Sequence, residues 1–140
     1  VCATLGTTST CAFDDLPSIG AVCRKYSIYL HVDAAYAGSC FICPEYKHHL
    51  KGIEYVDSYN FNATKCLMVN MDCSLVWFRN AKSVENAFVV DPEYLKHKHQ
   101  GDIVDFRNMQ IPLGRRFRAL KLWFVLRSMG VAGLQHNIRQ

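Results

Sequence analysis

Leu30-His31-Val32-Asp33-Ala34-Ala35-Tyr36-Ala37-Gly38 gives the first indication of how this 140-residue chain folds. Residues 28–32 are largely apolar and predict a buried strand that ends at an aspartate. Residues 1–5 predict an earlier strand of the same kind, and a helix capped by Asp14 or Asp15 is expected between the two. Strands joined by a helix in this way normally run parallel. The sequence therefore predicts an α/β fold.

The rest of the chain continues the alternation of strands and helices. The expected elements are a helical segment at 45–50, strands at 57–61, 67–69 and 74–78, a helix at 81–87 and a helix at 113–129. Residues 89–111 have weak periodicity and many charged residues, which predicts a long loop. Gly130 is expected to end the last of these helices, and another helix should start near Val131.

The composition is that of one ordinary globular domain with a real core. Half of the residues are hydrophobic, 20% are charged and the formal net charge is +4. Part of the positive charge comes from a cluster near the C-terminus, made of Arg115, Arg116, Arg118, Lys121 and Arg127. We interpret this basic cluster as the paired or solvated face of a helix, because no nucleic-acid recognition motif accompanies it in the sequence.

Several features of the sequence point to a piece of a longer cytoplasmic enzyme. The chain has no initiator Met, begins in mid-strand, and is expected to contain neither a signal peptide nor a membrane-spanning stretch. Its seven cysteines are scattered and lie mostly in apolar runs. We expect them to be reduced, as is usual inside cells, because a domain with this much core does not need disulfide staples.

The sequence does not predict a metal site. Cys40 and Cys43 match the C-x-x-C pattern, but no second pair follows at metal spacing. His97 and His99 stand two residues apart in the polar loop, where carboxylates that would converge with them are lacking.

Two residues occupy positions from which a cofactor could be held. Asp33 closes a strand, and Lys65 comes just after the next strand, 32 residues later. Ligands of open α/β sheets bind beyond the carboxyl ends of the strands. A carboxylate there can keep the ring nitrogen of pyridoxal phosphate (PLP) protonated, and a lysine amine can anchor the cofactor covalently. The pair therefore predicts a PLP site, with the small side chain of Ala35 as a platform against the ring.

Each candidate residue also has a purely structural interpretation. Asp33 could cap a helix, and Lys65 taken alone would be a surface charge. The hydroxyls of Thr7-Thr8 could contact the cofactor or orient the aspartate, or they could form a polar turn. His31 is expected to be a hydrogen-bonded core histidine rather than a ligand. Tyr94 could be a packing aromatic or, in a loop, a proton donor.

Four segments of the chain have a specific order and spacing: Ala3-Thr4-Leu5-Gly6-Thr7-Thr8, His31-Val32-Asp33-Ala34-Ala35-Tyr36-Ala37-Gly38, Tyr94-Leu95-Lys96-His97 and Ile111-Pro112-Leu113-Gly114-Arg115-Arg116-Phe117. Together they resemble the group II PLP-dependent decarboxylases, in particular the aromatic-L-amino-acid decarboxylases of insects. The resemblance implies fold type I, the aspartate aminotransferase fold, with a mainly parallel sheet and a homodimeric assembly. Residues 1–112 would belong to the large PLP-binding domain, and residues 113–140 would lead into the small C-terminal domain.

The resemblance also implies a role for each candidate residue. Residues implied to contact the cofactor are Asp33, Lys65, Thr8, Ala35, Asn62 and Thr64. Tyr94 would return a proton to the α-carbon of the substrate after carbon dioxide leaves, from a loop that reaches toward the neighbouring subunit. Gly114 stands where aromatic decarboxylases carry Gly, which favours a catechol or indole substrate. The implied reaction converts an aromatic L-amino acid, such as DOPA, 5-hydroxytryptophan or tyrosine, to its amine.

The chain departs from the family pattern around the lysine. Relatives usually read Asn-Pro-His-Lys-Trp, whereas this chain reads Asn62-Ala63-Thr64-Lys65-Cys66. Two alternatives stay open: an insect-type aromatic aldehyde synthase, which releases aldehyde, ammonia and peroxide, and a non-catalytic paralogue. The residue expected to separate decarboxylase from synthase lies in an earlier segment that is not among these residues. The 140 residues by themselves are expected to be inactive.

Overall fold

The structure is a computed structural model that describes residues 1–90, 92–96, 98–99, 102 and 106–140. The chain divides into two compact units. The first comprises Val1–Arg79 and Phe117–Gln140, and the second comprises Asn80–Arg116. In the part of the chain that the structure describes, no helix is both long and apolar enough to cross a membrane.

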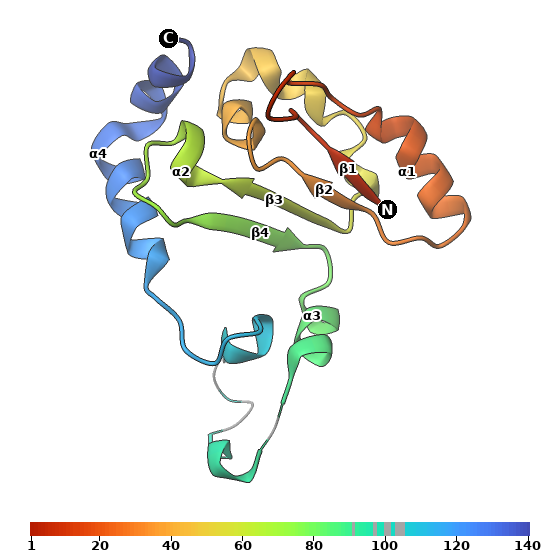
Figure 1. Cartoon of the computed structure of the whole chain (residues 1–140), viewed down its shortest axis with the longest axis vertical. Helices are drawn as coiled ribbons and strands as arrows, with labels where there is room; N and C mark the ends of the chain where they lie inside the picture. The colour runs from red at the N-terminus through yellow and green to blue at the C-terminus, as the bar shows by residue number, and fades with distance from the viewer. Residues whose placement is uncertain (91, 97, 100–101, 103–105) are drawn as a thin grey trace. The chain divides into compact units, whose positions relative to one another are not determined.

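The first unit is built on a four-stranded sheet (Figure 1). Its strands, in spatial order, are β1 (Cys2–Thr4), β2 (His31–Asp33), β3 (Ser58–Asn62) and β4 (Ser74–Phe78). The first three run parallel, and β4 pairs with β3 in the antiparallel direction. The predicted α/β fold with a mainly parallel sheet is confirmed.

Helices cover one face of this sheet. Helix α1 (Leu16–Lys25) lies between β1 and β2 in the chain, and three 3-10 segments, η1 (Gly38–Ile42), η2 (Pro44–Leu50) and η3 (Ile53–Tyr55), lie between β2 and β3. The first core cluster of this unit includes Leu5, Leu16, Leu30, Val32 and Phe41. A second cluster gathers around Leu134 of α4 (Arg118–Ile138) and includes Ala63, Leu67, Val69 and Cys73.

Alternation along the strands divides the side chains between the two faces. Val32 and Tyr59 pack with the first core cluster. Their neighbours in sequence, His31, Asp33, Ser58, Asn60 and Asn62, therefore lie on the opposite face. Along β2 and β3, hydrophobic residues face the first core cluster and polar residues lie on the opposite face, which is how the sequence positions its candidate site.

Three sequence predictions differ from the structure in detail. The strand expected at 67–69 is wrong, because β3 leads directly into a short helix, α2 (Ala63–Cys66), which also places Lys65 in a helix rather than a loop. The apolar residues of that run are buried in the second core cluster instead, and a short apolar run does not distinguish a strand from a packed turn. The helix expected from residue 113 begins at Arg118.

Other boundaries agree better. Helix α4 has non-helical angles at Gly130, with φ of 62° and ψ of 177°, which confirms the predicted break there. Asp15 occupies the N-cap position of α1, but its carboxylate accepts a hydrogen bond from the hydroxyl of Ser18 rather than from the helix backbone. The carboxylate of Asp14 accepts from the backbone N–H of Thr4 at 2.7 Å and so ties the helix entry to β1.

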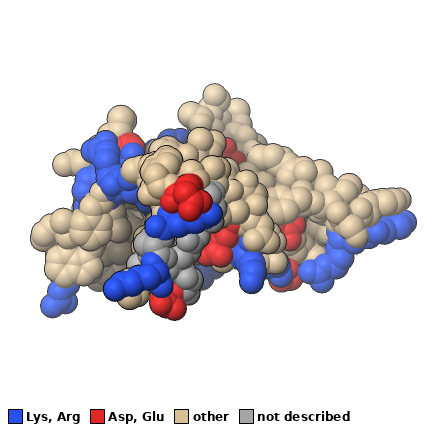
Figure 2. Space-filling view, turned by 90° about the horizontal axis from the view of Figure 1, so that it is seen from below, with Lys and Arg blue, Asp and Glu red and all other residues tan. Residues whose placement is uncertain are grey.

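Part of the basic cluster is paired, as predicted. Nε of Arg118 donates to Oδ2 of Asp72 at 2.8 Å. Nζ of Lys121 donates to the carbonyl oxygens of Asn70 at 2.9 Å and of Asp72 at 2.7 Å. These bonds attach the first turn of α4 to the loop before β4. On the face seen in Figure 2, Lys and Arg side chains are interspersed with Asp and Glu, and most of the surface is uncharged.

The second unit contains one regular helix, α3 (Ala81–Phe88), among its described residues. The helix confirms the prediction for 81–87, and the side chain of Asn80 caps it by accepting from the N–H of Ser83 at 3.2 Å. The described residues that follow form two 3-10 turns, η4 (Glu93–Leu95) and η5 (Phe106–Met109), in otherwise irregular backbone. This agrees with the predicted long loop.

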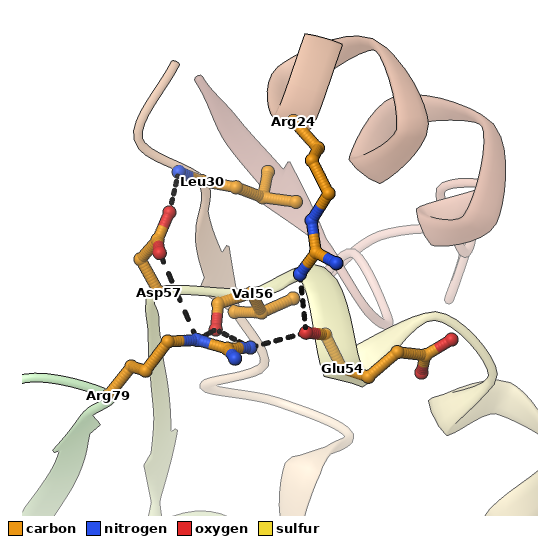
Figure 3. A network of polar contacts seen from close by, with 6 residues as sticks. All are labelled: Arg24, Leu30, Glu54, Val56, Asp57 and Arg79. Atoms are coloured by element: carbon orange, nitrogen blue, oxygen red, sulfur yellow. Dashed lines mark hydrogen bonds and ion pairs between the residues drawn. The ribbon is translucent and has the colours of Figure 1, made fainter. Parts of the chain in front are cut away.

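A network around Arg79 fastens the amino ends of β2 and β3 (Figure 3). Asp57, just before β3, accepts from the N–H of Leu30 at 2.8 Å, just before β2. Nε of Arg79, just after β4, donates to the carbonyl oxygen of Val56 at 3.0 Å. Its guanidinium also donates to the carbonyl oxygen of Glu54. The ion pair between Arg79 and Asp57 is long, at 3.9 Å, and half exposed, so the bonds to backbone carry most of the effect.

We predict that Arg79→Met lowers the free energy of unfolding by about 1–3 kcal/mol, because the carbonyl group of Val56 loses its bonds from Arg79 and that of Glu54 keeps only the long bond from Arg24 at 3.5 Å. Urea unfolding of the protein that carries this chain measures the change. The matched control is Lys47→Met, which removes an exposed cation from η2 of the same unit. Equal midpoints for the two variants would contradict the prediction.

Candidate functional site

The candidate site lies at the carboxyl ends of β2 and β3. Asp33 is the last residue of β2, and Asn62 is the last residue of β3. The two following segments are joined, because the N–H of Asn62 donates to the carbonyl oxygen of Ala35 at 3.2 Å. Sγ of Cys66 lies 3.6 Å from the carbonyl oxygen of Tyr36, and Nζ of Lys65 lies 5.8 Å from the Tyr36 ring centroid. The structure therefore brings Asp33 and Lys65 to one edge of the sheet.

The carboxylate of Asp33 is held through one of its two oxygens. Oδ1 accepts from the N–H of Ala35 at 2.9 Å and from Nδ2 of Asn60 at 3.3 Å. Among the described residues, no hydrogen bond ends on Oδ2. Asp33 does not cap an α-helix, since the next helical segment is η1, which starts at Gly38. The half-buried carboxylate is thus oriented with one oxygen open.

The segment around Lys65 is ordered by Asn62, the N-cap of α2. Oδ1 of Asn62 accepts from the N–H of Thr64 at 2.9 Å and from its hydroxyl at 2.6 Å. The one hydroxyl proton of Thr64 is therefore used within the turn, while Nδ2 of Asn62 keeps its donors. Lys65 is exposed, and its ammonium takes part in no ion pair with any residue that the structure describes.

The small residues beside Asp33 serve two purposes. Ala34 is fully buried. A Cβ on Gly38 would stand 2.5 Å from Cβ of Phe61 and 2.8 Å from Oη of Tyr59, so this position must be glycine for η1 to approach β3. Ala34 and Gly38 are thus explained by packing alone. Ala35 remains half-buried at the sheet edge, where a flat ring could lie against it.

The loop after β1 borders the same edge. The N–H of Leu5 donates to the carbonyl oxygen of Asp33 at 3.0 Å, and Gly6 is packed so tightly that an added Cβ would lie 2.3 Å from Cβ of Ala37. The hydroxyl of Thr7 accepts from the N–H of Ala12 at 2.9 Å, so the polar-turn interpretation holds for this residue. Thr8 is exposed in the same turn, and its role stays a prediction.

Two polar residues of β3 escaped the sequence analysis. Oγ of Ser58 lies 2.7 Å from Nδ1 of His31, and Oδ1 of Asn60 lies 3.0 Å from Nε2 of the same ring. His31 is therefore hydrogen-bonded on both nitrogens, as expected for a structural histidine. The signal that could have found Ser58 and Asn60 is their spacing of two residues, which matches that of His31 and Asp33.

The remaining predicted site residues belong to the second unit. Tyr94 lies in η4 and is 78% exposed. Gly114 is exposed, and a Cβ placed on it would meet nothing within 4 Å. Their roles stay predictions. His97 lies outside the described residues, and no three His, Cys, Asp or Glu side chains of the described part gather to hold a metal ion.

Comparison with known proteins identifies what the chain is similar to. Residues 1–140 match the model of the pyridoxal-dependent decarboxylase conserved domain. The aromatic-L-amino-acid decarboxylase of Manduca sexta is 61% identical over 140 residues, which are all of this chain and 28% of that protein. The chain thus spans under a third of the length of this relative.

Solved structures show the same similarity. The structure of Oryza sativa TDC with PLP and tryptamine superimposes with a TM-score of 0.94 and 46% identity, over 99% of this chain and 29% of that one. The structure of Rhodiola rosea 4-hydroxyphenylacetaldehyde synthase gives a TM-score of 0.88 and 40% identity, over 99% of this chain and 27% of that one.

The thiol next to Lys65 is unusually acidic. All seven cysteines are free. A hydrogen bond from the thiol of Cys40 and the adjacent charge of Lys65 lower the pKa of Cys66 to about 6, although partial burial opposes them. The same hydrogen bond and burial raise the pKa of Cys40. At neutral pH, Cys66 is therefore the thiolate of the pair.

We predict that Cys66 is alkylated by iodoacetamide with a midpoint near pH 6, since the thiolate is the nucleophile and predominates above its pKa. Mass spectrometry of peptides labelled over a pH series gives the midpoint. Cys40→Ala removes the hydrogen-bond donor and should move the midpoint upward. A midpoint equal to that of free N-acetylcysteine in the unsubstituted protein would show that the prediction is wrong.

Proposed function

Because the chain belongs to the pyridoxal-dependent decarboxylase family, we propose that the protein carrying it binds PLP and converts an aromatic L-amino acid to the corresponding amine and carbon dioxide. The observation that carries the proposal is the fixed orientation of Asp33, with Oδ2 open, at the sheet edge that also holds Lys65. The identity to aromatic-L-amino-acid decarboxylases supports the substrate class.

The residues present fit PLP. The cofactor needs an anion for its ring nitrogen, an amine for its aldehyde and a flat, small surface for its ring. Asp33 supplies an oriented carboxylate, Lys65 supplies an exposed amine, and Ala35 supplies a half-buried methyl group. The phosphate would meet donors of Asn62, whose Nδ2 is available. A contact from Thr64 would require its hydroxyl to leave Oδ1 of Asn62.

PLP, when bound, supplies an aldehyde that bonds the amino group of the substrate and a ring that withdraws electrons while its nitrogen is protonated. In the proposed site, Oδ2 of Asp33 accepts the N–H of that ring and keeps the proton in place, because a nearby negative charge favours the protonated form. Nζ of Lys65 anchors the cofactor covalently. Ala35 packs against the ring, and Thr8 contacts its substituents.

Tyr94 completes the proposed reaction. Its exposed hydroxyl would transfer a proton to the α-carbon of the substrate once carbon dioxide has left. We propose that the loop carrying it acts at the site of the neighbouring subunit in a homodimer. Gly114, which is exposed in the second unit, is proposed to accommodate a catechol or indole side chain of the substrate. A cytoplasmic location fits seven free cysteines.

An aromatic aldehyde synthase is the second candidate. The similarity to the Rhodiola rosea enzyme is the reason to test for synthase activity. Its sequence identity to this chain, 40%, is lower than the 61% of the Manduca sexta decarboxylase. The two functions differ in product. With DOPA as substrate, the decarboxylase should give dopamine, whereas a synthase would consume oxygen and release hydrogen peroxide.

We predict that Lys65→Ala abolishes covalent attachment of PLP. In the described part of the chain, no other lysine amine lies at this edge of the sheet. Borohydride reduction followed by peptide mass spectrometry should find PLP on the Lys65 peptide of the unsubstituted protein and on no peptide of the variant. Lys51→Ala, an exposed lysine after η2, is the matched control and should keep the modification. An unsubstituted protein that binds no PLP would indicate the non-catalytic paralogue.

We predict that Tyr94→Phe lowers amine formation by about a hundredfold, because the phenolic proton is lost while the aromatic ring is kept. Product analysis with DOPA in air should show the remaining turnover shifted toward aldehyde and ammonia, with consumption of oxygen and release of hydrogen peroxide. The binding of PLP should be unchanged, since Tyr94 is not proposed to contact it. Full amine output from the variant would rule out Tyr94 as the proton donor.

A further inference from the structure

We propose that Asn60 and His31 are positioning residues for Asp33, and that together with Ser58 they form a directed chain of hydrogen bonds that fixes its carboxylate for the ring nitrogen of PLP. This inference rests on the proposed function, since it assigns Asp33 its task. It adds two residues, neither of which would touch the substrate or the cofactor.

This chain of hydrogen bonds follows from the pairing of β2 with β3. In this parallel pair, His31 stands opposite Ser58 and Asp33 stands opposite Asn60. The four side chains therefore share one face of the sheet, in two adjacent rows. Two of the contacts run directly across the rows, and the one between His31 and Asn60 runs diagonally. Ser58 contacts His31 at 2.7 Å, His31 contacts Asn60 at 3.0 Å, and Asn60 contacts Asp33 at 3.3 Å.

The chemistry of the groups fixes the direction of every bond. An ionised carboxylate can only accept, so the atom of Asn60 that faces Asp33 must be Nδ2. Oδ1 of Asn60 then faces His31 and must accept from Nε2–H. In the neutral ring, Nδ1 is left as an acceptor and receives the hydroxyl proton of Ser58. All three bonds therefore donate toward Asp33, and such aligned bonds polarise one another.

Burial makes this chain of hydrogen bonds costly to break at Ser58, the residue farthest along it from Asp33. Ser58 is only 4% exposed, so its hydroxyl depends on His31 for a partner. Asn60 uses both ends of its amide, one on His31 and one on Asp33. A side chain held at both ends loses little further freedom when a ligand binds. The amide of Asn60 thus presents a fixed donor to the carboxylate.

The consequence for Asp33 is a fixed choice of oxygen. The N–H groups of Ala35 and Asn60 occupy Oδ1 and so leave Oδ2 for the ring nitrogen. Without Asn60, the carboxylate would keep one local bond and could rotate. Asn60 therefore acts directly on Asp33, and His31 acts on it through Asn60.

The test is a set of variants in the protein that carries this chain. Asn60→Leu removes the direct donor and should weaken the binding of PLP about tenfold. His31→Leu leaves Asn60 in place without its donor and should weaken binding about fivefold, whereas His31→Gln retains a donor and should restore most of the affinity. Fluorescence titration gives the dissociation constants, and the circular dichroism of bound PLP should fall per molecule bound in both Leu variants.

Tyr59→Phe is the matched control. It lies between Ser58 and Asn60 but faces the core, so it should leave the affinity and the circular dichroism of PLP unchanged. Urea unfolding identifies any variant that is not folded, and His31→Leu carries the test if Asn60→Leu fails.

The outcomes separate the two proposals. If the unsubstituted protein carries no PLP on Lys65, the proposed function itself fails and the inference falls with it. If it does carry PLP but His31→Leu and His31→Gln behave alike, or Tyr59→Phe weakens binding as much as His31→Leu, only the positioning role is overturned.

Discussion

The parallel pairing of β2 with β3 is the constraint on which the rest of the structure depends. Its register sets Asp33 beside Asn60 and His31 beside Ser58, and it ends both strands at the same edge. A slip of β2 by one residue would turn Asp33 toward the core and bring Val32 to the polar face. The hydrophobic contacts of Val32 in the first core cluster oppose that slip. The core thereby determines which face of the sheet Asp33 occupies.

The sequence was sufficient to predict the residues that stand at strand ends, because apolar runs reveal where buried strands stop. Asp33 and Lys65 were found in this way, and the family resemblance fitted the PLP-dependent decarboxylase fold that the TM-scores confirm. Ser58 and Asn60 were not found, since their importance depends on the register between two strands rather than on the sequence of either one. The run at 67–69 was misjudged for a similar reason. Its apolar residues pack against Leu134, far away in sequence, and tertiary packing decided their conformation.

The segment around Asp33 and the turn around Lys65 each contain residues that stabilise the fold and residues that are proposed to act on the cofactor. Gly38 and Ala34 lie beside Asp33 in sequence, but their small size is explained by the approach of η1 to β3. Ala35 alone among these small residues is left half-buried at the edge. The turn around Lys65 shows the same two roles. Asn62 stabilises the turn by capping α2, whereas Lys65 stays exposed. Thr64 is bonded to Asn62 within this turn, and Cys66 contacts the segment that follows Asp33.

The two ends of the β2–β3 pair are fastened by different means, and the difference has a physical reason. At the amino ends, Arg79 and Asp57 bind mainly backbone groups, which any sequence would offer. On the polar face, side chains bind side chains from His31 and Ser58, the first residues of the two strands, to Asp33 at the carboxyl end of β2, and this last acceptor keeps one oxygen open. A carboxylate that must meet a ligand cannot be saturated by the protein, so its orientation has to be imposed through the other oxygen. The Arg79 network holds the amino ends of β2 and β3 rigid and so helps to preserve the orientation of the Asp33 carboxylate, because a precise site needs rigid supporting elements.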